Sequence, residues 1–356
     1  MEETIFTYIN EEYETNRGIL KNRKENLKSF IDLAKGKKYN GWTVLATGSS
    51  ANAIECAKYY VEKILNINIE IKMPFVFSNY NSQIDDNTLY LAVTQGGHSY
   101  STIAAMKEVR KTSSDIVAIT ANMNSIVCDL SKYVVDIGCG EEKVGYVTKG
   151  FSGTVLTFIL MGLELAYENK KISEDYYYKE IEKIEDAIGY IDIVIEKSLK
   201  WYEYNKDELV SGKRFVAIGY GPGYGVAREA DTKITETVRV PMNGYELEEY
   251  MHGPYLSLSD KDHIIFIEAE SKLQERQVTL RNYLEEYTEH TYAITYKETS
   301  DNKHDLTLGI SIDEMISPLL FAIPIQILSY FPAEDKGNKL SDKIFSDFDE
   351  KLKSKI

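Results

Sequence analysis

VLATGSSANAIECAKYYVEKI, residues 44–64, is the stretch that decides the fold. Its apolar start is typical of a buried strand, and a helix-like pattern begins directly after Gly48, Ser49 and Ser50. The stretch therefore predicts a strand, a tight polar turn and a helix. A helix start offers unpaired backbone N–H groups and a partial positive charge, so this turn suits an anion such as a phosphate.

A second turn of the same kind follows an apolar run at residues 87–94. It reads TQGGHS, residues 94–99, and a further helical pattern continues to about residue 111. Either turn alone could be ordinary helix capping by serine or threonine. Two such turns in one parallel sheet favour a pocket for a phosphorylated small molecule.

The overall composition narrows the classes of function. The chain has 356 residues and a formal net charge of −15, which argues against a nucleic-acid surface or an anionic-membrane surface. The three cysteines form no CxxC pair, and the five histidines lack metal-ligand spacing. We therefore expect reduced cytoplasmic thiols and no metal.

Neither targeting nor membrane segments are expected. The N-terminus, MEETIFTYINEEYETN, is acidic and polar, unlike a signal peptide. The longest apolar stretches, Gly153–Tyr167 and Ile316–Phe331, are shorter than the roughly 20 residues of a bilayer span. Both are better interpreted as core helices, and the expected location is the cytoplasm.

Strands alternate with helices along the whole chain, and the second half repeats the plan of the first. Strands are expected near 43–47, 69–74, 87–94, 115–120, 133–137, 214–218, 263–268 and 291–296. Gly48 and Gly221 match at an offset of 173 positions, which indicates a duplicated domain. We expect two α/β domains, each a parallel sheet between two helical layers, with ligand at the carboxyl ends of the strands. The expected segments are a helical segment 1–38, domains 39–185 and 186–340, and a tail 341–356.

Charged residues in the second half are candidates for catalysis. Glu229, Lys233 and Glu236 are spaced i, i+4, i+7, so they share one face of a helix. They form either a solvated Glu–Lys ladder or a face that presents one carboxylate as a general base. His252 ends a short helix-like segment, where it is either a C-terminal cap or a proton shuttle. His98, in the second turn, is expected to be a surface or capping residue.

A dinucleotide cofactor is not expected. The turn GYGPG, residues 219–223, continues as GxGxGxG, whereas the dinucleotide fingerprint is GxGxxG followed by an acidic residue after the next strand. We expect no metal or redox cofactor.

These motifs together resemble the tandem SIS (sugar isomerase) domain family. The chain is similar to the isomerase half of glucosamine-6-phosphate synthase and to the fructosamine-6-phosphate deglycases. The resembling stretches are ATGSSANA (46–53), VTQGGHSYST (93–102, like SQSGET), EEKVGYVTKGF (141–151, like GVASTKAF), the run 219–254 ending in ELEEYMHGP (like ELKHGP), and PLLFAIPIQILSY (318–330, like PLQLLAY). The resemblance implies two SIS domains with a flavodoxin-like three-layer αβα fold.

The resemblance also implies roles for individual residues. Glu236 matches the glutamate that moves the proton between the first two sugar carbons, and His252 matches the histidine linked to ring opening. In the family that histidine comes from the neighbouring subunit, which implies a homodimer. The implied substrate contacts are Gly48, Ser49, Ser50, Thr94, Gln95, Gly97, Ser99, Val147 (through its backbone) and Lys233.

Three features depart from the family's pattern. Gly96 replaces the second serine of SQSGET, His98 replaces its glutamate, and the C-terminal lysine of the family could be Lys343, Lys351 or Lys355. The chain also has no cysteine before Cys56, so no built-in ammonia supply from glutamine is expected.

The sequence therefore favours a phosphosugar isomerase or deglycase. The expected substrate is a hexose 6-phosphate bearing an amine or amino acid, with proton transfer between C1 and C2. The alternative is a phosphosugar-binding sensor without catalysis.

Overall fold

Two separate parallel sheets make up the β-structure of the computed structural model, which describes residues 3–80, 83–112, 114–342 and 344–354. The first sheet contains β1 (Gly41–Leu45), β2 (Asn68–Lys72), β3 (Thr88–Val93), β4 (Ile116–Thr120) and β5 (Tyr133–Asp136). The second contains β6 (Phe215–Gly219), β7 (Met242–Glu246), β8 (His263–Glu268), β9 (Thr291–Thr295) and β10 (Leu306–Thr307).

The two sheets have the same topology. The spatial order is β2-β1-β3-β4-β5 in the first sheet and β7-β6-β8-β9-β10 in the second, and every pairing is parallel. This is the flavodoxin-like order, in which the strands on the two sides of the first strand are added in opposite directions, so the order switches between the first and third strands of each sheet. The expected fold class and the internal repeat are confirmed.

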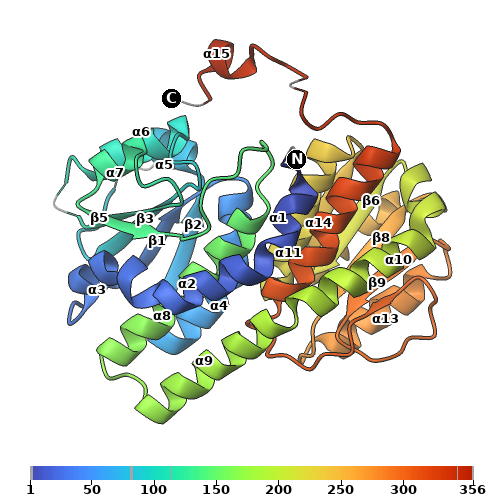
Figure 1. Cartoon of the computed structure of the whole chain (residues 1–356), viewed down its shortest axis with the longest axis horizontal. Helices are drawn as coiled ribbons and strands as arrows, with labels where there is room; N and C mark the ends of the chain where they lie inside the picture. The colour runs from blue at the N-terminus through green and yellow to red at the C-terminus, as the bar shows by residue number, and fades with distance from the viewer. Residues whose placement is uncertain (1–2, 81–82, 113, 343, 355–356) are drawn as a thin grey trace. The chain divides into compact units, whose positions relative to one another are not determined.

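Helices cover both faces of the first sheet (Figure 1). Trp42 of β1 packs edge-on against Phe30 of α3 (Lys28–Ala34) and Phe158 of α8 (Lys149–Glu168), and α8 packs along α4 (Ser49–Leu65). On the opposite face, Leu45 joins a core cluster with α5 (Pro74–Tyr80), α6 (Tyr100–Val109) and α7 (Ile126–Leu130). Residues that point to opposite faces of β1 are thus buried against different helical layers, as expected when both faces of a parallel sheet are covered.

The second sheet is covered in the same way. A core cluster joins β6, β8 and β9 to α12 (Leu247–Tyr250) and α13 (Gln274–Leu284). The helices α10 (Ile191–Ser211) and α11 (Pro222–Thr237) both pack against α14 (Pro318–Asp335), which is almost fully buried. The remaining helices are α1 (Ile5–Asn10), α2 (Glu12–Asn26), α9 (Glu174–Gly189), a 3-10 turn at Pro254–Ser257 and α15 (Phe348–Leu352).

Contacts divide the chain into two units that are not continuous in sequence. The first-sheet unit comprises Glu14–Lys143, Lys149–Glu182 and Asp342–Ile356. The second-sheet unit comprises Met1–Tyr13, Val144–Thr148 and Lys183–Ser341. The limits predicted for the repeated domains stay predictions, because these units are defined by contacts rather than by the repeat.

The structure corrects three local predictions. The expected helix over residues 1–38 is three helices, α1, α2 and α3. The helix expected from Gly225 begins at Pro222, because proline is well tolerated in the first turn of a helix. Strand β7 was not expected at all, since it is short, largely polar and contains Gly244.

One helix, α8, is long and apolar enough to cross a membrane by length and composition alone. Within the described residues, 94% of its most apolar window is buried. Burial of this kind fits the core helix that the sequence predicts for residues 153–167.

The close packing of α4 and α8 depends on the missing side chain of Gly162. A Cβ at this position would lie 2.9 Å from Val61 Cγ2, whereas a Cβ at Gly18, inside α2, would have no neighbour within 4 Å. We predict that Gly162→Ala lowers the free energy of unfolding by about 1–3 kcal/mol through overpacking. Gly18→Ala should raise it by about 0.5–1 kcal/mol, because alanine is the better helix former. Urea unfolding measures both, and equal stabilities of the two variants would contradict this packing.

Candidate functional site

The first predicted turn forms the start of α4 at the carboxyl end of β1. Gly48 precedes the helix with φ 56° and ψ −140°, a conformation that favours glycine. Ser49 and Ser50 occupy the first helical turn and are 8% and 5% exposed, so their backbone N–H groups point out of the helix start. The Ser49 hydroxyl has no hydrogen-bond partner within the part of the chain that the structure describes. This turn has the donors and the partial positive charge that an oxyanion requires.

The second predicted turn lies beside the first, because β3 pairs with β1. Gly97 is buried with φ 74°, and a Cβ there would lie 2.0 Å from Ser125 Oγ. The Thr120 hydroxyl and the Ala121 N–H both donate to the Gln95 carbonyl, at 3.0 and 2.9 Å. The loop is thus held by β4 and its following turn, and this support was not expected from the sequence.

A chain of hydrogen bonds joins the two turns. The Thr154 hydroxyl donates to the Gly150 carbonyl at 2.6 Å and accepts from Gln95 Nε2 at 3.2 Å. Gln95 Oε1 therefore faces Ser50, whose hydroxyl donates to it at 2.5 Å. This arrangement fixes the Gln95 amide and consumes the Ser50 proton, so the donors that Ser50 offers an anion are in its backbone.

The α6 start is capped from two directions. Ser99 is its N-cap residue, and its hydroxyl oxygen accepts from the Thr102 hydroxyl at 3.1 Å. The Tyr100 N–H donates to the Ser354 carbonyl at 3.2 Å, so the chain's tail lies at this helix start. Lys351 is exposed and pairs with Asp347 at 2.5 Å, while Lys343 and Lys355 lie outside the described residues.

In the second-sheet unit, α11 carries a charged cluster. Lys233 is 4% exposed in its side chain, and its Nζ lies 2.8 Å from Glu236 Oε2 and 3.9 Å from Glu229 Oε1. Glu229 is buried, whereas 44% of the Glu236 side chain is exposed. The cluster is therefore not a solvated ladder: a buried ammonium holds a partly exposed carboxylate in place.

His252 lies one residue beyond the end-cap of α12 and is exposed. Its Nδ1 is 2.7 Å from the Glu248 carbonyl. A carbonyl can only accept, so in the neutral ring Nδ1 carries the proton and Nε2 presents a lone pair. This geometry fits both predicted roles, since it caps the helix and leaves a basic nitrogen at the surface.

Val147 belongs to a short loop, residues 144–148, that groups with the second-sheet unit. The next residue, Thr148, is buried, and its hydroxyl donates to the Tyr146 carbonyl at 3.1 Å. The predicted residues thus divide between the two units: Gly48, Ser49, Ser50, Thr94, Gln95, Gly97 and Ser99 in the first-sheet unit, and Val147, Lys233, Glu236 and His252 in the second-sheet unit.

The second sheet repeats the first turn but not the second. Gly221 precedes α11 with φ 49° and ψ −131°, almost the conformation of Gly48. The strand registers place Glu268 where the first sheet has Thr94. Glu268 is fully buried, 3.3 Å from Arg281 Nε, and burial raises the pKa of its carboxyl. A carboxyl here disfavours a phosphate, so the hydroxyl-lined turns of the first sheet are the candidate anion site.

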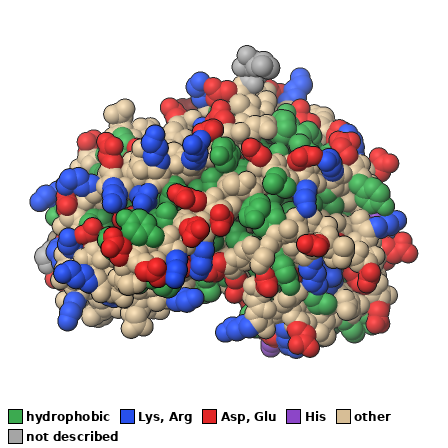
Figure 2. Space-filling model, turned by 60° about the horizontal axis from the view of Figure 1, so that its bottom comes forward, with side chains coloured by type: hydrophobic (Ala, Val, Ile, Leu, Met, Phe, Trp, Pro, Cys, Tyr) green, Lys and Arg blue, Asp and Glu red, His purple; other side chains and the backbone are tan. Residues whose placement is uncertain are grey.

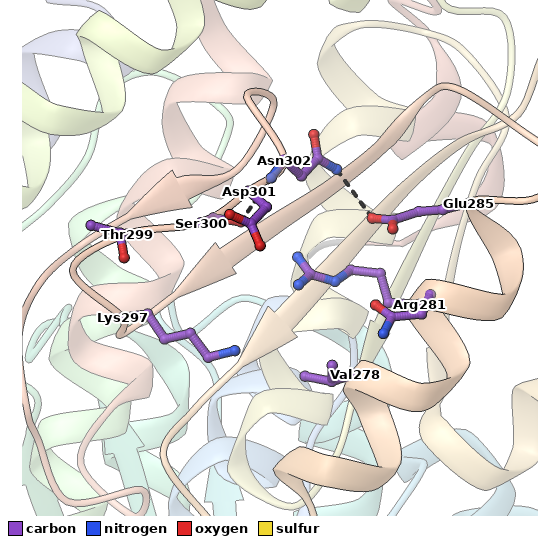
Figure 3. A pocket seen from close by; sticks show the side chains of 9 residues that line it. Val278, Arg281, Glu285, Lys297, Thr299, Ser300, Asp301 and Asn302 are labelled. Atoms are coloured by element: carbon purple, nitrogen blue, oxygen red, sulfur yellow. Dashed lines mark hydrogen bonds between the residues drawn. The ribbon is translucent and has the colours of Figure 1, made fainter.

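A cavity of about 470 Å³ lies elsewhere in the second-sheet unit (Figure 3). One face of α13 and the loop 297–302 form it, with Arg281 and Lys297 pointing inward. Arg281 is already paired with Asp305 at 2.5 Å, and none of the predicted site residues lines this cavity.

On the molecular face drawn in Figure 2, basic side chains lie among acidic ones.

Comparisons with known proteins support the resemblance. The model of the SIS domain matches residues 42–163 and 208–330. A glutamine–fructose-6-phosphate aminotransferase (isomerizing) from Thermococcus kodakarensis is 26% identical over an alignment of 310 residues, and the match covers 84% of this chain and 50% of the relative. The chain thus spans about half the length of the curated relatives it matches.

Two solved structures are also similar. A candidate phosphosugar isomerase from Clostridium difficile 630 is 31% identical with a TM-score of 0.92, and the match covers 100% of this chain and 99% of that one. A glucosamine-6-phosphate deaminase from Thermotoga maritima is 21% identical with a TM-score of 0.73, and the match covers 94% and 96%. The second likeness shows the shared fold alone.

The two glycines of the second turn provide a matched test of the anion site. Gly97→Ala would force a Cβ against Ser125 and strain a positive φ, whereas a Cβ at the exposed Gly96 would have no neighbour within 4 Å. We predict that Gly97→Ala weakens binding of glucose 6-phosphate at least tenfold, while Gly96→Ala changes it less than threefold. Isothermal titration measures both, and equal affinities would show that this turn does not form the site.

Proposed function

The chain belongs to the SIS domain family, and on that premise we propose that it is an enzyme acting on an amino-substituted hexose 6-phosphate. The proposed reaction is proton transfer between C1 and C2, either as an isomerisation or as the first step in removing the amine. The observation that carries the proposal is the pair of linked, hydroxyl-lined turns at the ends of β1 and β3.

These turns support a phosphate ligand. A phosphate needs several N–H or O–H donors and a positive potential in a chain whose net charge is −15. The start of α4 supplies N–H groups and the positive end of a 17-residue helix, while Ser49 and Thr94 add hydroxyls. Gln95 ties the turns together before any ligand arrives, so little reordering would accompany binding.

The charged cluster on α11 supports acid–base chemistry. A carboxylate that removes a proton beside a carbonyl must be ionised, accessible and held in one orientation. Glu236 is partly exposed, and the buried Lys233 ammonium holds it at 2.8 Å. Glu236 is therefore the proposed base, and the family's pattern assigns the same role to this position.

The proposed steps balance without a cofactor. Glu236 removes a proton from C1 of the open-chain 1-amino ketose while the C2 carbonyl oxygen takes up a proton, so the electron pair forms the C1–C2 double bond of an enaminol. Return of the proton to C2 gives an iminium at C1, which becomes an imine when its N–H proton leaves. Water then adds to that imine and releases the amine, leaving a hexose 6-phosphate. His252 would open the ring or protonate the leaving group through its basic ring nitrogen.

The choice of an amino sugar rests on the relatives rather than on the geometry. The Thermococcus relative is named as an aminotransferase that acts with fructose 6-phosphate. Plain ketose–aldose isomerisation uses the same proton transfer, so an assay panel should contain fructosamine 6-phosphates, glucosamine 6-phosphate and fructose 6-phosphate.

We predict that Glu236→Gln lowers kcat on the best of these substrates by several orders of magnitude, because an amide cannot take the proton. The Kd for that substrate should change less than tenfold, since the phosphate turns are untouched. Glu203→Gln, an exposed carboxylate on α10, removes the same charge and should leave kcat unchanged. Wild-type turnover in Glu236→Gln would remove Glu236 from the mechanism, and binding without any turnover by the wild type would favour the sensor alternative.

We further propose a homodimer in which each site takes His252 from the partner subunit. Mixing the inactive variants Glu236→Gln and His252→Asn tests this arrangement. In a mixed dimer with shared sites, one site keeps both wild-type residues, so activity should return to about a quarter of the wild-type value after subunit exchange. Size-exclusion chromatography establishes the dimer, and no recovery in mixed dimers would place both residues in one chain.

A further inference from the structure

A buried glutamine in α14 connects two segments that are distant in sequence. Gln326 is 3% exposed, and its Nε2 donates to Glu12 Oε1 at 2.7 Å and to the Thr148 carbonyl at 3.2 Å. Glu12 is fully buried, and both partners belong to the second-sheet unit with α14. One side chain thus holds Glu12, the first residue of α2, and the loop 144–148 against the same helix.

Neither leucine nor glutamate could make both of the hydrogen bonds that the Gln326 amide makes. A carboxylate and a carbonyl both accept hydrogen bonds, so the NH2 group of Gln326 must face them, and its two protons satisfy one acceptor each. A leucine has the same bulk but offers no donor. A glutamate offers no donor when ionised, and it would place a second negative charge beside Glu12.

The loop that Gln326 holds is the one that carries Val147. Thr148 is the residue after Val147, its carbonyl lies in the peptide that leads to Lys149, and its hydroxyl donates back to the Tyr146 carbonyl. The bond from Gln326 and the bond to Tyr146 therefore restrain the backbone on the two sides of Val147. Val147 is only partly buried.

The same helix supports the catalytic cluster. Within the second-sheet unit, α14 packs along α11, which carries Lys233 and Glu236 (Figure 1). The helix is buried along most of its length, so it is a rigid reference for both neighbours. Gln326 thus sets where the Val147 backbone lies relative to the helix that carries Glu236.

We propose that Gln326 is a positioning residue that holds the loop 144–148 in register with α11 for the sugar portion of the ligand. This inference rests on the proposed function, since it gives the Val147 backbone a sugar to contact. Gln326 does not touch the substrate. It acts through the Thr148 carbonyl.

The first test compares Gln326→Leu with Gln277→Leu. Gln277 is a matched control, because it is also buried in a helix, α13, and its Nε2 donates to the Ile218 carbonyl at 3.1 Å. In Gln326→Leu, hydrogen–deuterium exchange of the peptide that covers residues 144–149 should rise at least tenfold. Its Kd for glucose 6-phosphate should rise about tenfold, with the Kd for inorganic phosphate unchanged. Gln277→Leu should change the melting temperature about as much as Gln326→Leu does. It should change neither the exchange of residues 144–149 nor the Kd for glucose 6-phosphate.

A double variant separates the two hydrogen bonds of Gln326. In Glu12→Gln/Gln326→Glu the amide and the carboxylate exchange places, so the contact between positions 12 and 326 can re-form with the donor reversed. A carboxylate cannot donate to the Thr148 carbonyl. The double variant should therefore recover the thermal stability lost in Gln326→Glu, while loop exchange and sugar-phosphate affinity remain defective.

The outcomes distinguish this inference from the proposed function. Unchanged loop exchange in Gln326→Leu would overturn the inference, whatever the ligand assays give. Increased exchange with unchanged glucose 6-phosphate affinity would also overturn it, because the loop would then be irrelevant to the ligand. If the wild type bound none of the sugar phosphates, the proposed function would fail together with the positioning role, and the exchange data would still report the anchoring of the loop.

Discussion

The proposed anion site depends on one constraint: α4 begins at the end of β1, beside the loop that follows the neighbouring strand β3 of a parallel sheet. The start of α4 carries N–H groups without intrahelical partners, and β1 lies beside β3, so the loop 94–99 lies at the same edge of the sheet as these donors. In a chain with a net negative charge, an anion binds where N–H donors create a local positive potential. The Ser50–Gln95–Thr154 chain of hydrogen bonds keeps the two turns in a fixed relation.

Duplication preserved the architecture while the chemistry of the two halves diverged. Gly48 and Gly221 share an unusual backbone conformation at equivalent places, because both must turn the chain sharply into a helix. Where the first sheet has Thr94, the second has the buried carboxyl of Glu268. The second repeat instead presents Lys233 and Glu236 on the helix that follows its own turn. Under the proposed function, the first repeat would bind the phosphate and the second would supply the acid–base groups.

Local sequence patterns predicted the structural features that depend on residues close together in the chain. The strand–turn–helix at residues 44–64, its repetition near Gly221 and the buried character of α8 and α14 follow from apolar periodicity and turn residues. Strand β7 was missed, because its stability comes from pairing with β6 and from the close approach of α11 to Gly244 rather than from an apolar pattern. Hydrogen-bond partners that are far apart in the chain could not be predicted for the same reason. Thr154 is 59 positions from Gln95, and Glu12 is 314 positions from Gln326.

We have proposed that the turns of the first sheet hold the phosphate while Glu236 reaches the first two sugar carbons. A crystal structure of the protein with a bound, non-reactive hexitol 6-phosphate tests it most directly. We predict that the phosphate binds at the start of α4 and against loop 94–99, with a Glu236 carboxylate oxygen about 3 Å from C1 or C2. A phosphate bound elsewhere, or Glu236 turned to solvent in every subunit, would contradict it.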